Sequence, residues 1–436
     1  MIKHFFILSV AAIMAVTSSV AQTSGSNSPY SRYGWGTLAD EAQGFNKGMG
    51  GVGIGARNRS ILNYQNPASY SAIDSITFIF DAGISLQTGR WSENGKHANA
   101  LNSTLDYVQA GFRLRRNLGI SIGMRPISIV GYDFYTTTQM NNDDGFGEYT
   151  CSSSYKGDGG IREAWLGAGW SPFKSFSIGV RGGYIWGSYE HNASITYSNT
   201  NIHSLARLYK ANINTYSLNV GMQYGIKLSK KDELTIGATL GIGHDIDSRS
   251  TFTNQKMTTT SSLGGDTLVA PKAFQLPMSY GVGFLFKHNG KWAIGADYTC
   301  QLWKDCKFPE VNEQNGSYTY SAQKNTFRNR HKIALGAEYI PNPEGLKIRH
   351  HIAYRAGVSY STSYINQNGN DPKTYLVSAG MELPIVNMYN NRSVLNVSVQ
   401  WEHLAPAQSH ALKEDYLRLC LGLTFNASWF NKWRIE

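Results

Sequence analysis

The chain has 436 residues, of which 45 are glycine and 26 are tyrosine, while charged residues make up only 16%. Four cysteines are too few for a disulfide scaffold, and the basic residues are scattered instead of clustered with aromatics, which argues against nucleic acid as a partner. The formal charge of +10 instead suggests anionic surroundings, such as lipopolysaccharide or acidic phospholipid head groups.

The first segment has the pattern of a secretory signal peptide. An apolar run from Phe5 to Val16 follows a short basic start, and Ser19-Val20-Ala21 offers small residues where a signal peptidase cleaves. The run is too short for a comfortable membrane span, and no cysteine follows it that could carry a lipid. We therefore expect residues 1–21 to be a signal peptide that is removed during export.

Nothing after residue 21 resembles a transmembrane helix, but alternation of period two is sustained from about residue 75 onward. Between Leu417 and Phe425, large apolar side chains occupy one face, and Arg418, Cys420, Gly422 and Thr424 occupy the other. Apolar-out and small-or-polar-in is the pattern of a membrane barrel wall, and only a closed barrel can span a bilayer without helices. A soluble sandwich or propeller is the alternative that composition alone leaves open.

Tight and long connections alternate strictly between these strands. A membrane barrel with short periplasmic turns and long outer loops predicts this alternation, whereas a soluble sandwich does not. The tight turns fall at 115–117, 171–174, 230–232, 288–290 and 342–345, and the long connections at 91–103, 137–160, 192–212, 249–276, 307–327, 361–372 and 404–413. We predict an all-β protein, a transmembrane antiparallel barrel of about fourteen strands over residues 75–426, followed by a periplasmic extension at 427–436.

Residues 22–74 do not fit the wall. They are rich in glycine and serine and lack sustained alternation, yet they carry large apolar residues such as Trp35 and Tyr64 that need burial. We expect this segment to fold into the lumen as an N-terminal hatch or plug.

At this point the chain resembles the FadL family of long-chain fatty-acid transporters. A glycine-rich segment leads to Asn66-Pro67-Ala68 just before the first strand, and in that family a hatch ending in Asn-Pro-Ala sits inside a fourteen-stranded barrel. The chain is still more similar to the FadL-like barrels of the Bacteroidetes, in the segments Pro29–Gly34, Gly48–Gly53, Asn66–Tyr70 and Leu417–Glu436. The family's ligand-binding residues have no match here, and eleven residues, Asn426 to Glu436, follow the last alternating strand.

Motifs for cofactors are weak. Gly48, Gly50, Gly51 and Gly53 include the string of a dinucleotide fingerprint, but neither a strand nor a helix flanks them, so we interpret them as hatch glycines and expect no cofactor. Asn141–Gly145 resembles a calcium loop but lacks the closing acidic residue, and a solvated outer loop fits better.

The pattern also argues against metal and enzyme chemistry. His350 and His351 are adjacent on a strand-like segment and point to opposite faces, which disfavours a metal site with His331. No nucleophile elbow is indicated at a strand-to-helix turn, and we expect no enzyme activity. One loop disulfide, Cys151 with Cys306, remains compatible with the spacing.

Pro126 lies inside the predicted third strand, Leu118–Tyr135. Proline cannot donate to a β ladder, so it marks either a kink or a position near the periplasmic rim. In FadL proteins the third strand is kinked inward and opens a lateral exit, and the resemblance makes Pro126 a candidate lateral gate. Several aromatics, including Trp165, Trp170, Trp303 and Trp401, are expected to form interface girdles.

Two functions follow. The leading hypothesis is an integral protein of the bacterial outer membrane that takes up small hydrophobic, fatty-acid-like molecules passively through a hatch-gated lumen. The alternative is a non-transporting scaffold or accessory barrel in an outer-membrane protein assembly or type IX secretion complex, with protein partners in place of a small ligand. A continuous apolar tunnel would favour transport, and a filled lumen with apolar outer loops would favour the scaffold.

Overall fold

The structure is a computed structural model that describes residues 27–75, 77–93, 95–140, 148–199, 201–258, 262–315, 317–345, 347–366, 371–385, 393–408 and 411–428. The predicted signal peptide, the loop at Asn141–Gly145 and most of the predicted C-terminal extension lie outside these residues.

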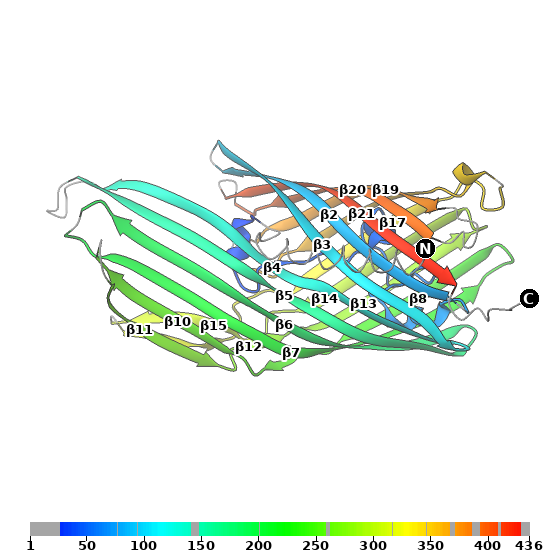
Figure 1. Cartoon of the computed structure of the whole chain (residues 1–436), viewed down its shortest axis with the longest axis horizontal. Helices are drawn as coiled ribbons and strands as arrows, with labels where there is room; N and C mark the ends of the chain where they lie inside the picture. The colour runs from blue at the N-terminus through cyan, green and yellow to red at the C-terminus, as the bar shows by residue number, and fades with distance from the viewer. Residues whose placement is uncertain are drawn as a thin grey trace, which may run out of the picture.

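Fourteen antiparallel strands close into a barrel, which confirms the predicted fold class (Figure 1). Sequential strands pair with one another, and the last strand pairs back with the first, from Thr77↔Ser428 to Ser92↔Lys413. Such closure leaves neither the first nor the last wall strand as an edge in the hydrocarbon region. The wall strands are β2 (Thr77–Glu93), β3 (Lys96–Arg115), β4 (Leu118–Met140), β5 (Tyr149–Phe173), β6 (Phe176–Tyr197), β7 (Ser204–Lys227), β8 (Asp232–Gly241), β13 (Met278–His288), β14 (Trp292–Leu302), β17 (Arg330–Tyr339), β18 (Ala353–Thr362), β19 (Lys373–Ile385), β20 (Ser393–Ala405) and β21 (Lys413–Ser428).

The two faces of the wall differ as the alternation predicts. On β21, Leu417, Leu419 and Leu423 are exposed on the outside, while Cys420 and Thr424 are buried inside. Among the aromatics assigned to girdles, Trp170, Tyr184, Tyr280 and Trp401 are exposed on the outer surface. The girdle assignment is wrong for Trp165 and Trp303, which are buried. No described helix is long and apolar enough to cross a bilayer.

One end of the barrel carries short turns and the other carries long connections. The turns between β3 and β4, β5 and β6, β7 and β8, and β13 and β14 lie at the same end as Thr77 and Ser428. We name this the turn end and the opposite one the loop end. Short turns of outer-membrane barrels face the periplasm, so the turn end is assigned to the periplasm and the loop end to the outside.

At the loop end the strands continue far beyond the predicted boundaries. Segments 91–103, 137–160 and 192–212, predicted as loops, lie largely in the paired strands β2 to β7, so their predicted extent was wrong. β10 (Arg249–Met257) pairs with β7 and β11 (Ser262–Pro271) pairs with β10, which extends β4–β7 into an outer sheet (Figure 1). Strands in water lose the strong apolar alternation of lipid-facing strands, and their polar composition was therefore interpreted as loop.

A hydrophobic cluster, which we call the outer core, packs at the loop end. It joins the outer sheet to the two small hairpin-like sheets of β9 (His244–Ile246) with β12 (Phe274–Leu276) and β15 (Phe308–Gln314) with β16 (Ser317–Gln323). Trp35, Phe252, Phe274 and Trp303 lie at its centre, and Trp35 contacts both Phe274 and Trp303 edge-on. The outer loops are thus folded over an apolar core of their own.

The orientation can be tested by cysteine labelling on intact cells. A cysteine at Thr253 on β10 should react with a membrane-impermeant maleimide, because this exposed strand lies at the loop end. A cysteine at Lys230, in the turn between β7 and β8, should react only after the outer membrane is disrupted. Labelling at Lys230 but not at Thr253 on intact cells would reverse the assignment.

Candidate functional site

The interior of the barrel is occupied by residues 27–75, which we call the inner segment. It contains the 3-10 helices η2 (Pro29–Arg32) and η3 (Pro67–Ala72), the two-residue strand β1 (Thr37–Leu38) and the one-turn helix α2 (Gly44–Lys47). Most of its side chains are buried, and Trp35, Asn66 and Ala68 are 0% exposed. The segment therefore packs as part of the lumen, although whether it moves as a hatch stays a prediction.

Glycines on the inward face of the wall let this packing come very close. At Gly179 a Cβ would lie 2.3 Å from the carbonyl carbon of Pro67, and at Gly237 it would lie 2.2 Å from the carbonyl oxygen of Ile54. No such Cβ contact is sterically acceptable, so these wall positions require glycine because the backbone of the inner segment touches them. The same relation holds at Gly119, Gly169, Gly336, Gly357 and Gly422, whereas at Gly221 the nearest atoms belong to the side chains of Asn66 and Pro67.

The predicted Asn66-Pro67-Ala68 motif lies against this glycine-rich wall. Asn66 caps η3 by accepting a hydrogen bond from the amide of Ala68, at 3.2 Å. Its side-chain amide donates to the carbonyls of Ile54, at 2.9 Å, and Met222 of β7, at 3.1 Å. One buried side chain thus ties the start of η3 to another part of the inner segment and to the wall.

The glycine turn at residues 48–53 is held by side chains of the wall. Gly50 and Gly51 adopt positive φ angles of 66° and 89°, which glycine adopts without strain. The amides of Gly53 and Ile54 donate to one carboxylate oxygen of Asp297 on β14, at 2.6 and 2.9 Å. The backbone donors that a phosphate could use are therefore taken by a wall carboxylate.

Ion pairs line the inner face of the wall. Buried Arg355 on β18 donates to Glu338 at 2.7 Å, to Glu382 at 2.6 Å and to Asn396 at 2.6 Å. Arg418 on β21 pairs with Glu402 at 2.6 Å. These pairs link neighbouring wall strands from the inside, where charged side chains cannot be left unpaired cheaply.

Two further groups tie the inner segment to the wall. Lys47 of α2 lies 2.9 Å from Asp106 of β3 and donates to Ser85 of β2 at 3.1 Å. On β6, Arg181 donates to the carbonyl of Tyr64, at 3.0 Å, and its guanidinium also stacks over the Tyr64 ring. Charged side chains thus fix the inner segment to β2, β3 and β6.

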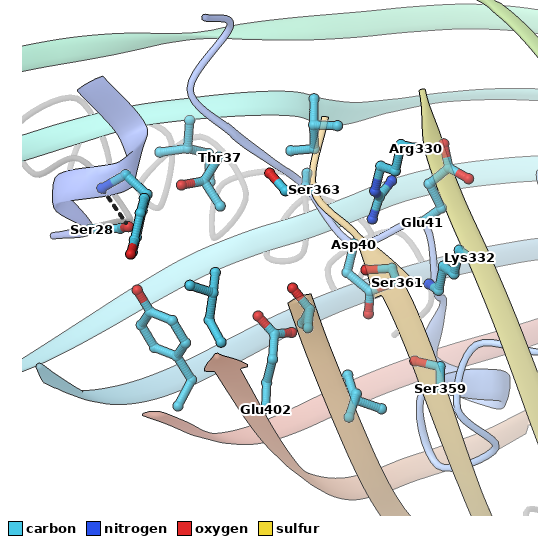
Figure 2. A pocket seen from close by; sticks show the side chains of 18 of the residues that line it. Ser28, Thr37, Asp40, Glu41, Arg330, Lys332, Ser359, Ser361, Ser363 and Glu402 are labelled. Atoms are coloured by element: carbon cyan, nitrogen blue, oxygen red, sulfur yellow. Dashed lines mark hydrogen bonds and ion pairs between the residues drawn. The ribbon is translucent and has the colours of Figure 1, made fainter. Parts of the chain in front are cut away.

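A cavity of about 200 Å³ remains in the lumen between the inner segment and the wall. Figure 2 shows Thr37, Asp40 and Glu41 of the inner segment across from wall residues of β17, β18 and β20. Its wall side presents hydroxyl groups and charges, including Ser359, Ser361, Arg330, Lys332 and Glu402. Apolar residues such as Leu38, Ile129 and Leu404 also line it, so the lining is mixed, and charged groups interrupt the apolar tunnel that a hydrocarbon would favour.

Pro126 lies where the wall opens. The ladder between β3 and β4 ends at Val108↔Met124, and the β4–β5 ladder carries a bulge between Pro126 and Ser128. Beyond this point no pairing joins the described residues of β3 and β4, and we name this gap the seam. Pro126 also lines the lumen cavity. Whether the seam acts as a lateral gate remains a proposal.

The inner segment itself covers the seam. β1 pairs with β4 at Thr37↔Ile129 and Leu38↔Ser128, and Ser31 exchanges hydrogen bonds with the backbone of Gly131 at 3.1 Å. On the β3 side, Asn27 donates to Asn102 at 3.0 Å. Residues 27–39 thus connect β3 to β4 across the seam.

Other predicted positions lie away from this site. His331 contacts Tyr298 and His351 contacts the carbonyl of Gly345, and no three His, Cys, Asp or Glu side chains among the described residues could hold a metal. All four cysteines are unpaired, so the Cys151–Cys306 bridge is not formed.

The sequence did not single out Asp297, which anchors the inner segment, or Arg355 and Glu163, which link wall strands from the inside. The sequence does mark these residues, because each is a charged side chain at an inward-facing position of a strand. Charges at membrane depth face an interior partner by default.

The comparisons with known proteins agree with this architecture. A family model described as BamG matches residues 1–436. The chain belongs to the BamG family. Among curated proteins, none matches the sequence of this BamG-family chain.

Several solved structures share the fold. The CymD monoaromatic hydrocarbon channel is 13% identical, covers 91% of this chain and 99% of its own, and has a TM-score of 0.57. A Pseudomonas aeruginosa FadL homologue is 11% identical, with 90% and 99% covered and a TM-score of 0.58. The Ralstonia pickettii toluene transporter TbuX is 12% identical, with 89% and 98% covered and a TM-score of 0.55.

These likenesses confirm a FadL-like outer-membrane barrel. At such identities they establish the fold and not the solute. The narrower resemblance to Bacteroidetes barrels stays a prediction. This BamG-family chain is an integral protein of the outer membrane.

Proposed function

We propose that this protein is a plugged outer-membrane barrel that serves as a scaffold or accessory subunit of an outer-membrane assembly. The observation that carries the proposal is the filled lumen. The inner segment touches the glycines of the wall, and Lys47, Asn66 and Asp297 fix it on different strands. A channel would have to break these buried contacts for passage, whereas a scaffold benefits from their rigidity.

The loop end supports the same role. The outer sheet and its hairpins carry an apolar core of their own and extend well beyond the bilayer wall (Figure 1). An open pore does not need a packed outer layer of this size, whereas a subunit that contacts other proteins outside the membrane uses one. We therefore place partner binding at the surfaces beyond the two rims of the barrel.

A channel for small hydrophobic molecules with lateral exit is the second candidate. The seam at Pro126 favours it, since this gap adjoins the lumen cavity. Two of the solved proteins named above, a monoaromatic hydrocarbon channel and a toluene transporter, add support. Against it stand the charged groups in the mixed lining and the volume of about 200 Å³, since ligand pockets are usually lined mainly by apolar side chains and measure roughly 300–1,000 Å³.

Purification from the native membrane in mild detergent tests the scaffold directly. A chromosomally tagged chain should copurify with defined partner proteins in fixed ratio through size exclusion at moderate salt. As a matched control, an unrelated tagged barrel of similar size should come out alone. Recovery of this chain by itself, from cells crosslinked before lysis as well as from untreated cells, would contradict a scaffold role.

A further inference from the structure

The turn end carries an unbalanced cluster of basic side chains, which we call the basic mouth. Its described carboxylates are fewer than its basic groups: Asp74, Asp232, Glu233, Glu338, Glu344 and Glu382, of which Asp232 pairs with His288 and both Glu338 and Glu382 pair with Arg355. The basic mouth comprises Arg57, Arg59, Arg113, Arg115, Arg116, Lys174, Lys227, Lys230, Lys231, Lys287, Lys291, Lys347 and Arg349.

None of these charges forms an ion pair within 4.0 Å among the described residues, although Arg57 interacts with Glu233 and Lys231 with Asp232 over a longer range. At the loop end, several basic side chains pair with nearby carboxylates, as Lys156 does with Asp133 and Arg328 with Asp371. Paired charges cancel at a distance, while unpaired charges of one sign add to a field that attracts the opposite sign. The net positive charge of the chain therefore lies mainly at the turn end.

The register of the strands shows where these side chains point. Lys227 continues the inward row of Gln223, and Lys287 continues that of Leu285. Lys287 donates to the carbonyl of Arg57 at 3.2 Å, which places its ammonium at the inner segment. Arg57 in turn donates to buried Ser177 on β6. These basic groups thus surround the axis of the barrel.

The lipid-facing positions of the same turns carry apolar residues instead. Leu114 and Leu228 are exposed, at 53% and 58%, and lie next to inward Arg113 and Lys227 on the opposite register. A site for anionic phospholipid would place its basic groups on the outer, lipid-facing side. Here that side is apolar, and the charges face water below the lumen.

We infer that the basic mouth is a docking surface for an acidic protein in the periplasm. Carboxylates of such a partner would meet the exposed turns at Arg115, Arg116, Lys174, Lys230 and Lys231, while the inward ring would attract an acidic segment toward the axis. The inference deepens the proposed scaffold role by naming the chemistry of one partner and the end at which it binds, and in that sense it rests on that role.

The test uses the full chain in phosphatidylcholine nanodiscs and fluorescent poly-L-glutamate as the probe. The mouth variant carries Arg115→Gln, Arg116→Gln, Lys174→Gln, Lys230→Gln and Lys231→Gln. The matched control carries the same number of changes at the loop end: Lys156→Gln, Lys210→Gln, Lys256→Gln, Lys272→Gln and Lys304→Gln. We expect the mouth variant to bind the probe at least about tenfold more weakly, since exposed pairs contribute up to about 1 kcal/mol each. The control should stay within about twofold of the wild type.

Equal weakening in both variants would overturn the inference, because net charge alone would then explain binding. An unchanged mouth variant would overturn it too. Selective loss of phosphatidylglycerol retention in the mouth variant, with probe binding intact, would assign the surface to lipid instead. Copurification of partners that persists in the mouth variant would refute periplasmic docking while leaving the scaffold role standing.

Discussion

Replacing Arg355 by methionine should lower the free energy of unfolding by about 3–5 kcal/mol, because it leaves buried charges without a partner. Arg355 is 7% exposed and binds two carboxylates, Glu338 and Glu382, as well as Asn396. Without the guanidinium, the two carboxylates would face each other in the interior, unpaired. Urea unfolding in detergent micelles, followed by tryptophan fluorescence, measures the change.

Two further variants separate charge from packing. Arg349→Met, at an exposed turn position, should change stability by no more than about 0.5 kcal/mol. Neutralising both partners, with Glu338→Gln and Glu382→Gln added to Arg355→Met, should restore much of the loss, because the uncompensated charges are gone. A single variant as stable as the wild type would show that this cluster does not hold the wall together.

Deleting residues 27–75 should turn a closed barrel into a conducting one. The inner segment fills most of the lumen, and barrels with more strands than about eight leave an aqueous channel unless something plugs them. In planar bilayers the wild type should show no stable conductance, whereas the deletion should show long-lived open events. Equal conductance of the two proteins would mean that the inner segment does not seal the barrel.

A variant with smaller changes guards against misfolding of the deletion. Lys47→Gln, Asn66→Ala and Asp297→Asn remove anchors on three sides of the lumen but leave the chain length intact. This variant should give brief, frequent openings that the wild type lacks. Gln400→Glu is not a suitable control, because its amide also binds Lys47, whereas the exposed position Asn58→Ala is suitable.

The wall of this protein was predictable because each strand carries its own signal. The alternation from Leu417 to Phe425 indicates directly which face of the strand contacts lipid. The structure confirms both faces of β21. Pro126 also has a local signal, since proline lacks the donor that a ladder needs, and the structure places a bulge there. The outer sheet had no such signal, because water covers strands that the bilayer does not reach.

The sequence could not show which residues contact one another in the lumen. Gly53 is bound by Asp297, and Arg355 by Glu382, across separations that leave no local pattern in the sequence. Trp165 was expected at the membrane interface, but it packs inside against Tyr64, because its register and not its residue type decides its face. Only the closed wall brings these positions together.

Uptake of a radiolabelled hydrocarbon such as toluene into proteoliposomes tests the central claim, that the lumen is closed and the barrel does not transport. The wild type should show uptake no faster than empty liposomes, and Pro126→Val, which restores a backbone donor at the seam, should change nothing. Uptake by the wild type that exceeds the liposome background and is lost in Pro126→Val would contradict the account, since it would show passage through the lumen and out at the seam.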